Sequence, residues 1–186
     1  GIIRLNNLTR EQILYRVTSI NELNDMADYI LIDTGAGIND QVLEFVMASP
    51  EVLLVTTPEP SSLTDSYSLL KALYRNPGFS DADTKIHIVA NRVNSREEGQ
   101  ALYEKVNSVV SQFLHGSLNF LGMIPQDLAL EKAVRQQKTV ALSYPNAKSS
   151  HAIENLAENL LNGTQEEIRE RWGIVQMFSS FLSNRK

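Results

Sequence analysis

The sequence predicts an α/β fold built on a mostly parallel sheet. Short apolar runs, each about one strand long, alternate along the chain with segments whose apolar residues recur at helical spacing. The connections between successive runs are too long for hairpins, so we expect parallel strands, right-handed crossovers and helices on both faces of the sheet. The predicted strands are residues 28–33, 52–57, 86–90 and 118–124.

The segments between these runs carry helix signals. Apolar residues recur at intervals of three and four, and capping residues stand just before them. The candidate caps are Thr9, Asn39 or Asp40, Ser61 or Ser62, Ser95 and Asp127. The predicted helices are residues 10–26, 40–48, 61–74, 95–113, 127–137 and 148–161, the last closed by Asn162-Gly163. Residues 139–142 are expected to form a short edge strand.

The first apolar run leads into the pattern with the clearest functional meaning. Tyr29 to Ile32 are apolar, and Asp33, Thr34, Gly35 and Gly37 follow them. An acid at the carboxyl end of a buried parallel strand, followed by a glycine turn, is typical of nucleotide hydrolases: the acid handles magnesium or water, and the loop senses the γ-phosphate. An ordinary Asp-Thr-Gly turn after a buried strand explains the same residues equally well.

Composition narrows the class of protein. The net charge is −5, which does not favour binding to nucleic acid. There is no cysteine, so disulfides and thiolate metal sites are excluded. The three histidines are far apart and lack the spacing of metal ligands. We find no apolar span long enough for a transmembrane helix and no signal peptide pattern.

A phosphate-binding loop is missing from the pattern. Hydrolysis of a nucleotide on such a sheet normally needs G-x-x-x-x-G-K-[ST] after a strand. None of the nine glycines is followed by Lys-Ser or Lys-Thr in that register. Either the protein needs no such loop, or the amino-terminal part of the domain is missing from this chain. We favour the second interpretation.

Four motifs, in order, resemble those of the MinD/ParA-type P-loop ATPases. Within that family the chain looks most like the flagellar-number regulators (FlhG, YlxH, FleN), chiefly through the TTPEPSSLTD and DTGAG segments. The chain departs from the family in one respect: it lacks the Walker A loop. We therefore expect this chain by itself to be inactive. The resemblance implies a MinD-like three-layer domain over residues 1–163. The motifs are D33-TGAGI, V55-TTPEPSSLTD, V89-ANRV and L121-GMIPQD.

The resemblance also implies roles for individual residues. Asp33 would be the catalytic acid, placed near magnesium and near the attacking water. It would contact the magnesium ion through water. Thr34, Gly35, Ala36 and Gly37 would rearrange around the γ-phosphate of ATP.

The remaining roles concern the base of the nucleotide. Asn91 would recognise adenine through its side-chain amide, and Arg92 would lie beside the base or ribose. Pro125 and Asp127 would form part of the other wall of the pocket that holds the base. Two simpler interpretations remain open: Asn91 ends a strand in a turn, and Asp127 caps a helix.

Residues 164–186 are expected to form a separate amphipathic helix. Thr164 and Glu167 have the spacing of a capping box. A bulky apolar face opposite small polar residues, with basic ends, is typical of a helix lying in a membrane interface. Packing on its own domain is the simpler alternative. The candidate membrane residues are Trp172, Ile174, Val175, Phe178, Phe181 and Leu182.

Together, the resemblance implies an ATP hydrolase that regulates flagellar number and placement. It would form an ATP-dependent homodimer, act with a FlhF-type GTPase and flagellar basal-body proteins, and be cytoplasmic and peripheral at the inner face of the cell membrane. No nucleic acid is expected as a partner. The alternatives are a non-catalytic interaction module on the same fold and a division-site or partition ATPase of the same superfamily.

Overall fold

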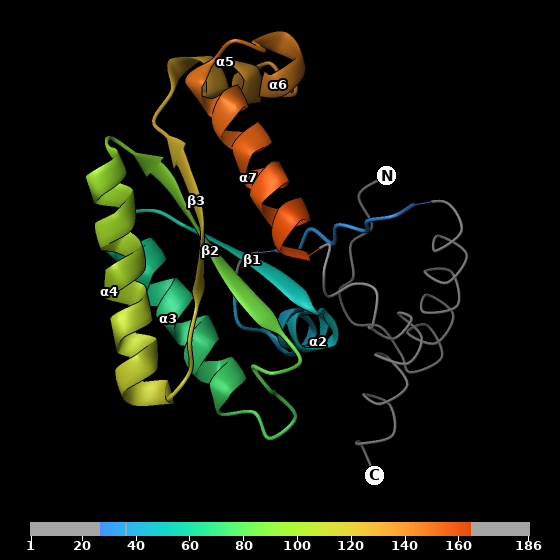
Figure 1. Cartoon of the computed structure of the whole chain (residues 1–186), viewed down its shortest axis with the longest axis vertical. Coiled ribbons are helices and arrows are strands. Elements are labelled where there is room, and N and C mark those ends of the chain that lie inside the picture. The colour runs from blue at the N-terminus through green and yellow to red at the C-terminus, as the bar shows by residue number, and fades with distance from the viewer. Residues whose placement is uncertain (1–26, 36, 165–186) are drawn as a thin grey trace.

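The computed structural model describes residues 27–35 and 37–164. Within them, β1 (Glu51–Thr56), β2 (Lys85–Val93) and β3 (Asn119–Pro125) form one parallel sheet in the order β1-β2-β3. The predicted α/β class and the parallel pairing are therefore confirmed. The helices are α2 (Asp40–Ala48), α3 (Pro60–Tyr74), α4 (Arg96–Leu114), α5 (Leu128–Arg135), α6 (Val140–Ser143) and α7 (Lys148–Thr164) (Figure 1).

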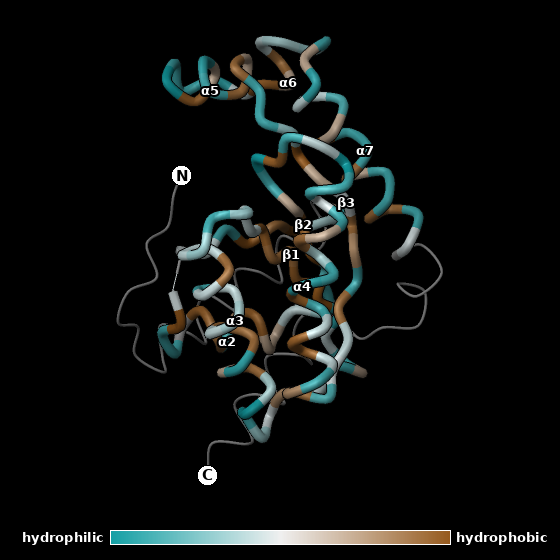
Figure 2. The backbone as a smooth tube through the Cα atoms, turned by 90° about the vertical axis from the view of Figure 1, so that its left-hand side faces the viewer, coloured by the Kyte–Doolittle hydropathy of each residue, from teal (hydrophilic) through white to brown (hydrophobic). Residues whose placement is uncertain are grey.

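The core lies between the sheet and helices α3 and α4. Alternate residues of β2, namely Ile86, Ile88 and Ala90, are buried toward these helices, as side-chain alternation along a strand requires. Leu70 of α3 and Val110 of α4 meet them and are fully buried. Figure 2 shows the apolar segments gathered where the strands face α3 and α4, whereas α7 alternates between polar and apolar residues.

The opposite face of the sheet is covered unevenly. Helix α7 packs on β3, so helices do lie on both faces (Figure 1). On β1, however, Leu53 and Val55 stay 40% and 53% exposed. The predicted two-sided burial therefore holds for the strands near α7 and fails for β1.

Several predicted helix starts are confirmed by their caps. The Asn39 side chain accepts a hydrogen bond from Val42 N at 3.0 Å, and the Ser95 side chain accepts one from Glu98 N at 3.2 Å. The predicted cap of α3 was wrong: its N-cap is Glu59, and Pro60 begins the helix. Ser62 Oγ instead accepts a hydrogen bond from the backbone N–H of Thr57 at 3.0 Å. A proline in the first helical turn costs no hydrogen bond there, which explains the earlier start.

Two predicted strands are absent. Residues 28–33 form no strand, and Leu31 is 84% exposed. A strand needs a neighbour for its N–H and C=O groups, and none of β1, β2 and β3 pairs with this run. Residues 139–142 instead enter helix α6, where Ser143 N and Tyr144 N donate hydrogen bonds to Thr139 O and Val140 O. A helical turn satisfies its backbone locally, without a strand beside it.

Other boundaries differ less. Helix α7 continues through Gly163 to Thr164, past its predicted end. The predicted helix over residues 10–26 and the helix beyond residue 164 lie outside the described residues.

One carboxylate fixes the start of two helices. Asp127 Oδ1 accepts a hydrogen bond from Ala129 N at 2.8 Å, which caps α5 as predicted. Asp127 Oδ2 accepts hydrogen bonds from Ser149 N at 3.0 Å and from Ser149 Oγ at 2.9 Å. Since Ser149 lies in the first turn of α7, Asp127 joins the loop after β3 to the helix that covers β3.

Truncation of Leu70 tests the core. Leu70→Ala removes a fully buried side chain between α3 and the sheet, so it should lower the free energy of unfolding by about 2–5 kcal/mol. Urea unfolding followed by circular dichroism measures this. Leu142→Ala, at a residue that is 84% exposed, is the matched control and should change stability by less than about 0.5 kcal/mol. Equal effects of the two variants would contradict the described core.

Removal of the Asp127 carboxylate tests the double cap. Asp127→Ala should lower the free energy of unfolding by about 1–2 kcal/mol, because both helix starts lose an acceptor. Asp83→Ala, in an exposed turn, should have little effect. A loss no larger in Asp127→Ala than in the control would rule out a capping contribution.

The cap also predicts a pH dependence. Hydrogen bonds from Ser149 N–H and then Ala129 N–H hold the pKa of Asp127 below its ordinary value of 3.8. A carboxyl whose folded-state pKa is depressed contributes stability above its unfolded pKa. The stability difference between wild type and Asp127→Ala should therefore be constant from neutral pH to about pH 5, and shrink as the pH falls below about 4. Acid unfolding curves of both proteins measure it.

Candidate functional site

The candidate site lies at the carboxyl edge of the sheet. The three strands are parallel and paired, so their last residues meet at one edge, and open α/β sheets bind ligands there. The loops that leave this edge lead into α3, α4 and α5. Asn91, Arg92, Pro125 and Asp127, predicted from the sequence, all lie on these strand ends or in the loop that follows β3.

Asn91 has the feature that points most directly to a ligand. Its side-chain oxygen Oδ1 is buried and has no hydrogen-bond partner. Among the described residues only one other buried side-chain polar atom shares this property, Oγ1 of Thr57, the residue directly after β1. A buried acceptor without a donor costs free energy, on the order of 1–3 kcal/mol, unless a water or a ligand supplies the donor. The sequence analysis did not single out Thr57.

Arg92 occupies an irregular point of the sheet. Its φ angle is 58°, in the left-handed region, and the pairing of β2 with β3 shifts register between Asn91 and Val93. The extra residue is a β-bulge, a feature common near active sites because it redirects a side chain. Arg92 Nε donates a hydrogen bond to Gln126 Oε1 at 3.2 Å, and Arg92 Nη1 lies 3.1 Å from Glu59 Oε1. The bulge thus lets one side chain link all three strand ends.

Pro125 and Asp127 lie on the neighbouring strand end. Pro125 is the last residue of β3 and pairs with Val93, and Gln126 N donates a hydrogen bond to Val93 O at 2.9 Å. Both carboxylate oxygens of Asp127 accept hydrogen bonds from the first turns of helices. These contacts are those of a helix cap, as the simpler interpretation predicted. It can still shape a wall by fixing the loop that carries Pro125.

The predicted phosphate loop has a different setting from the one expected. Asp33, Thr34, Gly35 and Gly37 are exposed and do not follow a strand, and Ala36 lies outside the described residues. Gly37 has a φ of 121°, a conformation that favours glycine. A single exposed carboxylate such as Asp33 suits a contact to magnesium through water, and does not by itself make a coordination site.

The predictions about the membrane and about metal ions are tested only within the described residues. Trp172, Ile174, Val175, Phe178, Phe181 and Leu182 lie outside them. Within residues 27–35 and 37–164, no helix combines the length and apolar character that crossing a bilayer requires, and no group of three or more His, Cys, Asp or Glu side chains is arranged to hold a metal ion.

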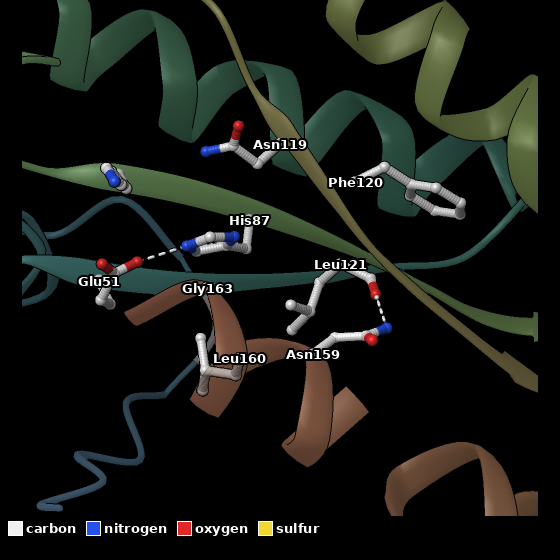
Figure 3. A pocket seen from close by; sticks show the side chains of 9 residues that line it. Glu51, His87, Asn119, Phe120, Leu121, Asn159, Leu160 and Gly163 are labelled. Carbon is white, nitrogen blue, oxygen red and sulfur yellow. Dashed lines mark hydrogen bonds and ion pairs between the residues drawn. The ribbon is translucent and has the colours of Figure 1, made fainter. Parts of the chain in front are cut away.

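A cavity of about 310 Å³ lies at the other end of the sheet (Figure 3). It opens beside the first residues of the strands and the last turns of α7. Two contacts join groups that line it: His87 Nε2 contacts Glu51 Oε2, and Asn159 Nδ2 donates a hydrogen bond to Leu121 O at 3.0 Å. Because ligands of parallel sheets bind at the carboxyl edge and the unpartnered acceptors lie there, we do not assign the functional site to this cavity.

Comparison with known proteins identifies relatives of the chain. The chain is 38% identical over 144 residues to the antiactivator FleN of Pseudomonas aeruginosa, which covers 77% of the chain and 50% of FleN. It is 35% identical over 158 residues to the flagellum site-determining protein YlxH of Helicobacter pylori, covering 83% of the chain and 52% of YlxH. The chain therefore spans about half the length of the curated relatives it matches. No protein-family model matches it.

Solved structures show the same fold. The MinC:MinD cell division complex of Aquifex aeolicus aligns with a TM-score of 0.61 at 21% identity, covering 84% of this chain and 60% of that one. MinD of Pyrococcus horikoshii, solved with Mg-ADP, aligns with a TM-score of 0.58 at 23% identity, covering 83% and 60%. Taken with the motifs and the parallel sheet, these likenesses show that the chain belongs to the MinD/ParA-type family of P-loop ATPases, on the side of the flagellar regulators FleN and YlxH.

Proposed function

We propose that the protein containing this chain is an ATP-dependent, dimerising and membrane-associating regulator of flagellar number and placement. The similarity to FleN and YlxH supports the biological role. The polar residues at the carboxyl edge of the sheet support the proposal that the ligand is a nucleotide. Hydrolysis of ATP would supply the switch, with two copies closing on each other in the ATP state and separating afterwards.

The single observation that carries the proposal is the unpartnered acceptor of Asn91. Its buried Oδ1 lies near the carboxyl end of the central strand β2, at the edge where sheets of this class bind ligands. Adenine presents a donor, its N6 amino group, next to the acceptor N7, and a side-chain amide matches this pair. A bound adenine would therefore satisfy the oxygen that the protein leaves without a partner.

The other site residues take supporting roles in the proposal. Arg92, held by Glu59 and Gln126, would lie beside the base or ribose, and Pro125 and Asp127 would form the opposite wall. Exposure of the Arg92 and Glu59 side chains, 55% and 58%, leaves room for a ligand to contact them.

In the proposal, the segment after residue 32 contacts the phosphates and the metal ion. Asp33 would act on magnesium and the attacking water, and residues 34–37 would surround the γ-phosphate. Magnesium supplies positive charge that stabilises the phosphate oxygens during transfer.

The proposed partners and location draw on one structural neighbour and on the helix predicted at the end of the chain. One structural neighbour is a MinC:MinD complex, so a protein of this fold forms a complex with another protein. We propose a FlhF-type GTPase, basal-body proteins and a second copy of this protein as partners. The protein would be cytoplasmic, peripheral at the inner face of the membrane through the amphipathic helix predicted for residues 164–186, a unit separate from the ATPase domain of residues 1–163.

Substitution of Asn91 tests the nucleotide site. In the full-length protein, Asn91→Ala should weaken ATP binding at least tenfold, because it removes the acceptor for the adenine amine. Calorimetric titration with ATP and magnesium measures the affinity. Asn159→Ala is the matched control, since Asn159 lies at the opposite end of the sheet, and should leave the affinity within about twofold.

Three results are decisive for this test. A weakened Asn91→Ala with an unchanged Asn159→Ala supports the site. Equal affinities of Asn91→Ala and wild type would contradict it. A full-length wild-type protein that binds no ATP would contradict the proposed function and favour the non-catalytic interaction module.

A charge on the apolar face of the last helix tests membrane association. Phe178→Glu should abolish ATP-dependent sedimentation of the full-length protein with vesicles of anionic phospholipid, because a carboxylate on that face opposes insertion among the acyl chains. Ser180→Glu places the same charge on the predicted polar face and should reduce binding much less. Similar losses in both variants would argue against a membrane-facing apolar stripe.

A further inference from the structure

Two unpartnered polar atoms belong to residues at neighbouring positions of the carboxyl edge. Thr56, the last residue of β1, pairs with Ala90 of β2, so Thr57 follows directly after β1 where Asn91 follows Ala90 in β2. These two residues carry Thr57 Oγ1 and Asn91 Oδ1, the buried side-chain atoms without a hydrogen-bond partner in the described part of the chain. Two such atoms at neighbouring positions of one sheet edge call for a common explanation.

Both side chains belong to the same face of the sheet. Thr56 and Ala90 are fully buried toward α3 and α4. Since side chains alternate along a strand, the residues that follow them turn to the other face, the one that α7 covers over β3.

The backbone of Thr57 is fixed, but its hydroxyl is not. Ser62 Oγ accepts a hydrogen bond from Thr57 N at 3.0 Å and lies 3.0 Å from Thr56 Oγ1. Ser62, in the first turn of α3, therefore bonds to the hydroxyl of Thr56 and to the backbone N–H of Thr57. It makes no hydrogen bond to Thr57 Oγ1. A hydroxyl needed only for folding would be expected to join this network.

The chemistry of the two atoms defines what would fit. An amide oxygen only accepts hydrogen bonds, and a hydroxyl oxygen can accept as well. They do not bond to each other. A group that donates two hydrogens from one atom satisfies both, and the exocyclic amino group of adenine is such a group.

We propose that Thr57 is a second specificity-determining residue of the nucleotide site, whose hydroxyl oxygen accepts one hydrogen of the adenine amino group while Asn91 Oδ1 accepts the other. The inference rests on the proposed function, since it assumes that adenine binds at this edge. It adds a second acceptor for the amine: guanine carries an oxygen in place of that amine, and this oxygen would face Asn91 Oδ1, which has no hydrogen to donate. A site built to pair with an amine rejects an analogue that lacks it.

The test compares two ligands and two variants in the full-length protein. Purine riboside 5′-triphosphate has no amino group and otherwise keeps the purine and the phosphates of ATP. Thr57→Val removes the hydroxyl at nearly constant volume, and Thr57→Ser keeps it. We expect Thr57→Val to weaken ATP binding about three- to tenfold and to leave the affinity for purine riboside triphosphate unchanged. Thr57→Ser should bind ATP within about twofold of wild type.

Thermal unfolding separates this role from a structural one. Thr57→Val should be as stable as wild type or more so, because it removes a buried hydroxyl that has no partner. Thr56→Val, which breaks the bond to Ser62, should be less stable. A marked loss of stability in Thr57→Val would assign its hydroxyl to a bound water or to folding and would overturn the proposal.

The remaining outcomes are equally clear. If Thr57→Val weakens both ligands equally, or neither, the hydroxyl does not contact the amino group and the proposal fails while ATP binding stands. If wild type itself binds no ATP, the proposed function fails first, and that result is visible before any variant is made.

Discussion

The structure depends on the burial of one strand between two parallel neighbours. β2 pairs with β1 on one side and β3 on the other, and its inward residues Ile86, Ile88 and Ala90 are almost completely removed from water. This pairing aligns the three carboxyl ends. The predicted site residues at the carboxyl edge are each held by a strand end or by the first turn after one, so the geometry of this edge follows from the register of the sheet.

The register of β2 with β3 shifts between Ile88 and Val89 and again near the end of β2, between Asn91 and Val93. The β-bulge at Arg92 puts a left-handed residue where the strand would otherwise continue, and turns a long basic side chain toward Glu59 and Gln126. Such a conformation costs free energy in a residue other than glycine. The neighbouring atoms Thr57 Oγ1 and Asn91 Oδ1 carry a second cost, that of lost hydrogen bonds. Both costs fall at one edge, which is the pattern expected where function, and not stability, selects the residues.

The loop after β3 shows how the edge is tied to the rest of the domain. Asp127 accepts hydrogen bonds from the first turns of α5 and α7, and α7 in turn covers β3. The wall of the site and the cover of the sheet are therefore fixed by one carboxylate. A sequence pattern recognises the cap of α5 because the acceptor and the donor are two residues apart. The bond to Ser149 spans 22 positions and is visible only in the folded chain.

The sequence by itself determined the α/β class, the parallel direction of the strands, most helix starts and the polar residues that stand at the strand ends. These features are encoded within a few residues: an apolar run, a cap, or a polar residue at a strand end. Only the tertiary structure decided which apolar runs became strands, since residues 28–33 pair with none of the described strands and residues 139–142 enter a helical turn instead. It also decided which polar atoms were left without partners. Thr57 reads in the sequence as one more threonine in a strand, and its hydroxyl stands out only because Ser62 bonds to its neighbour and its own backbone. Strand pairing and hydrogen-bond satisfaction join residues distant in the chain, and local patterns carry no record of them.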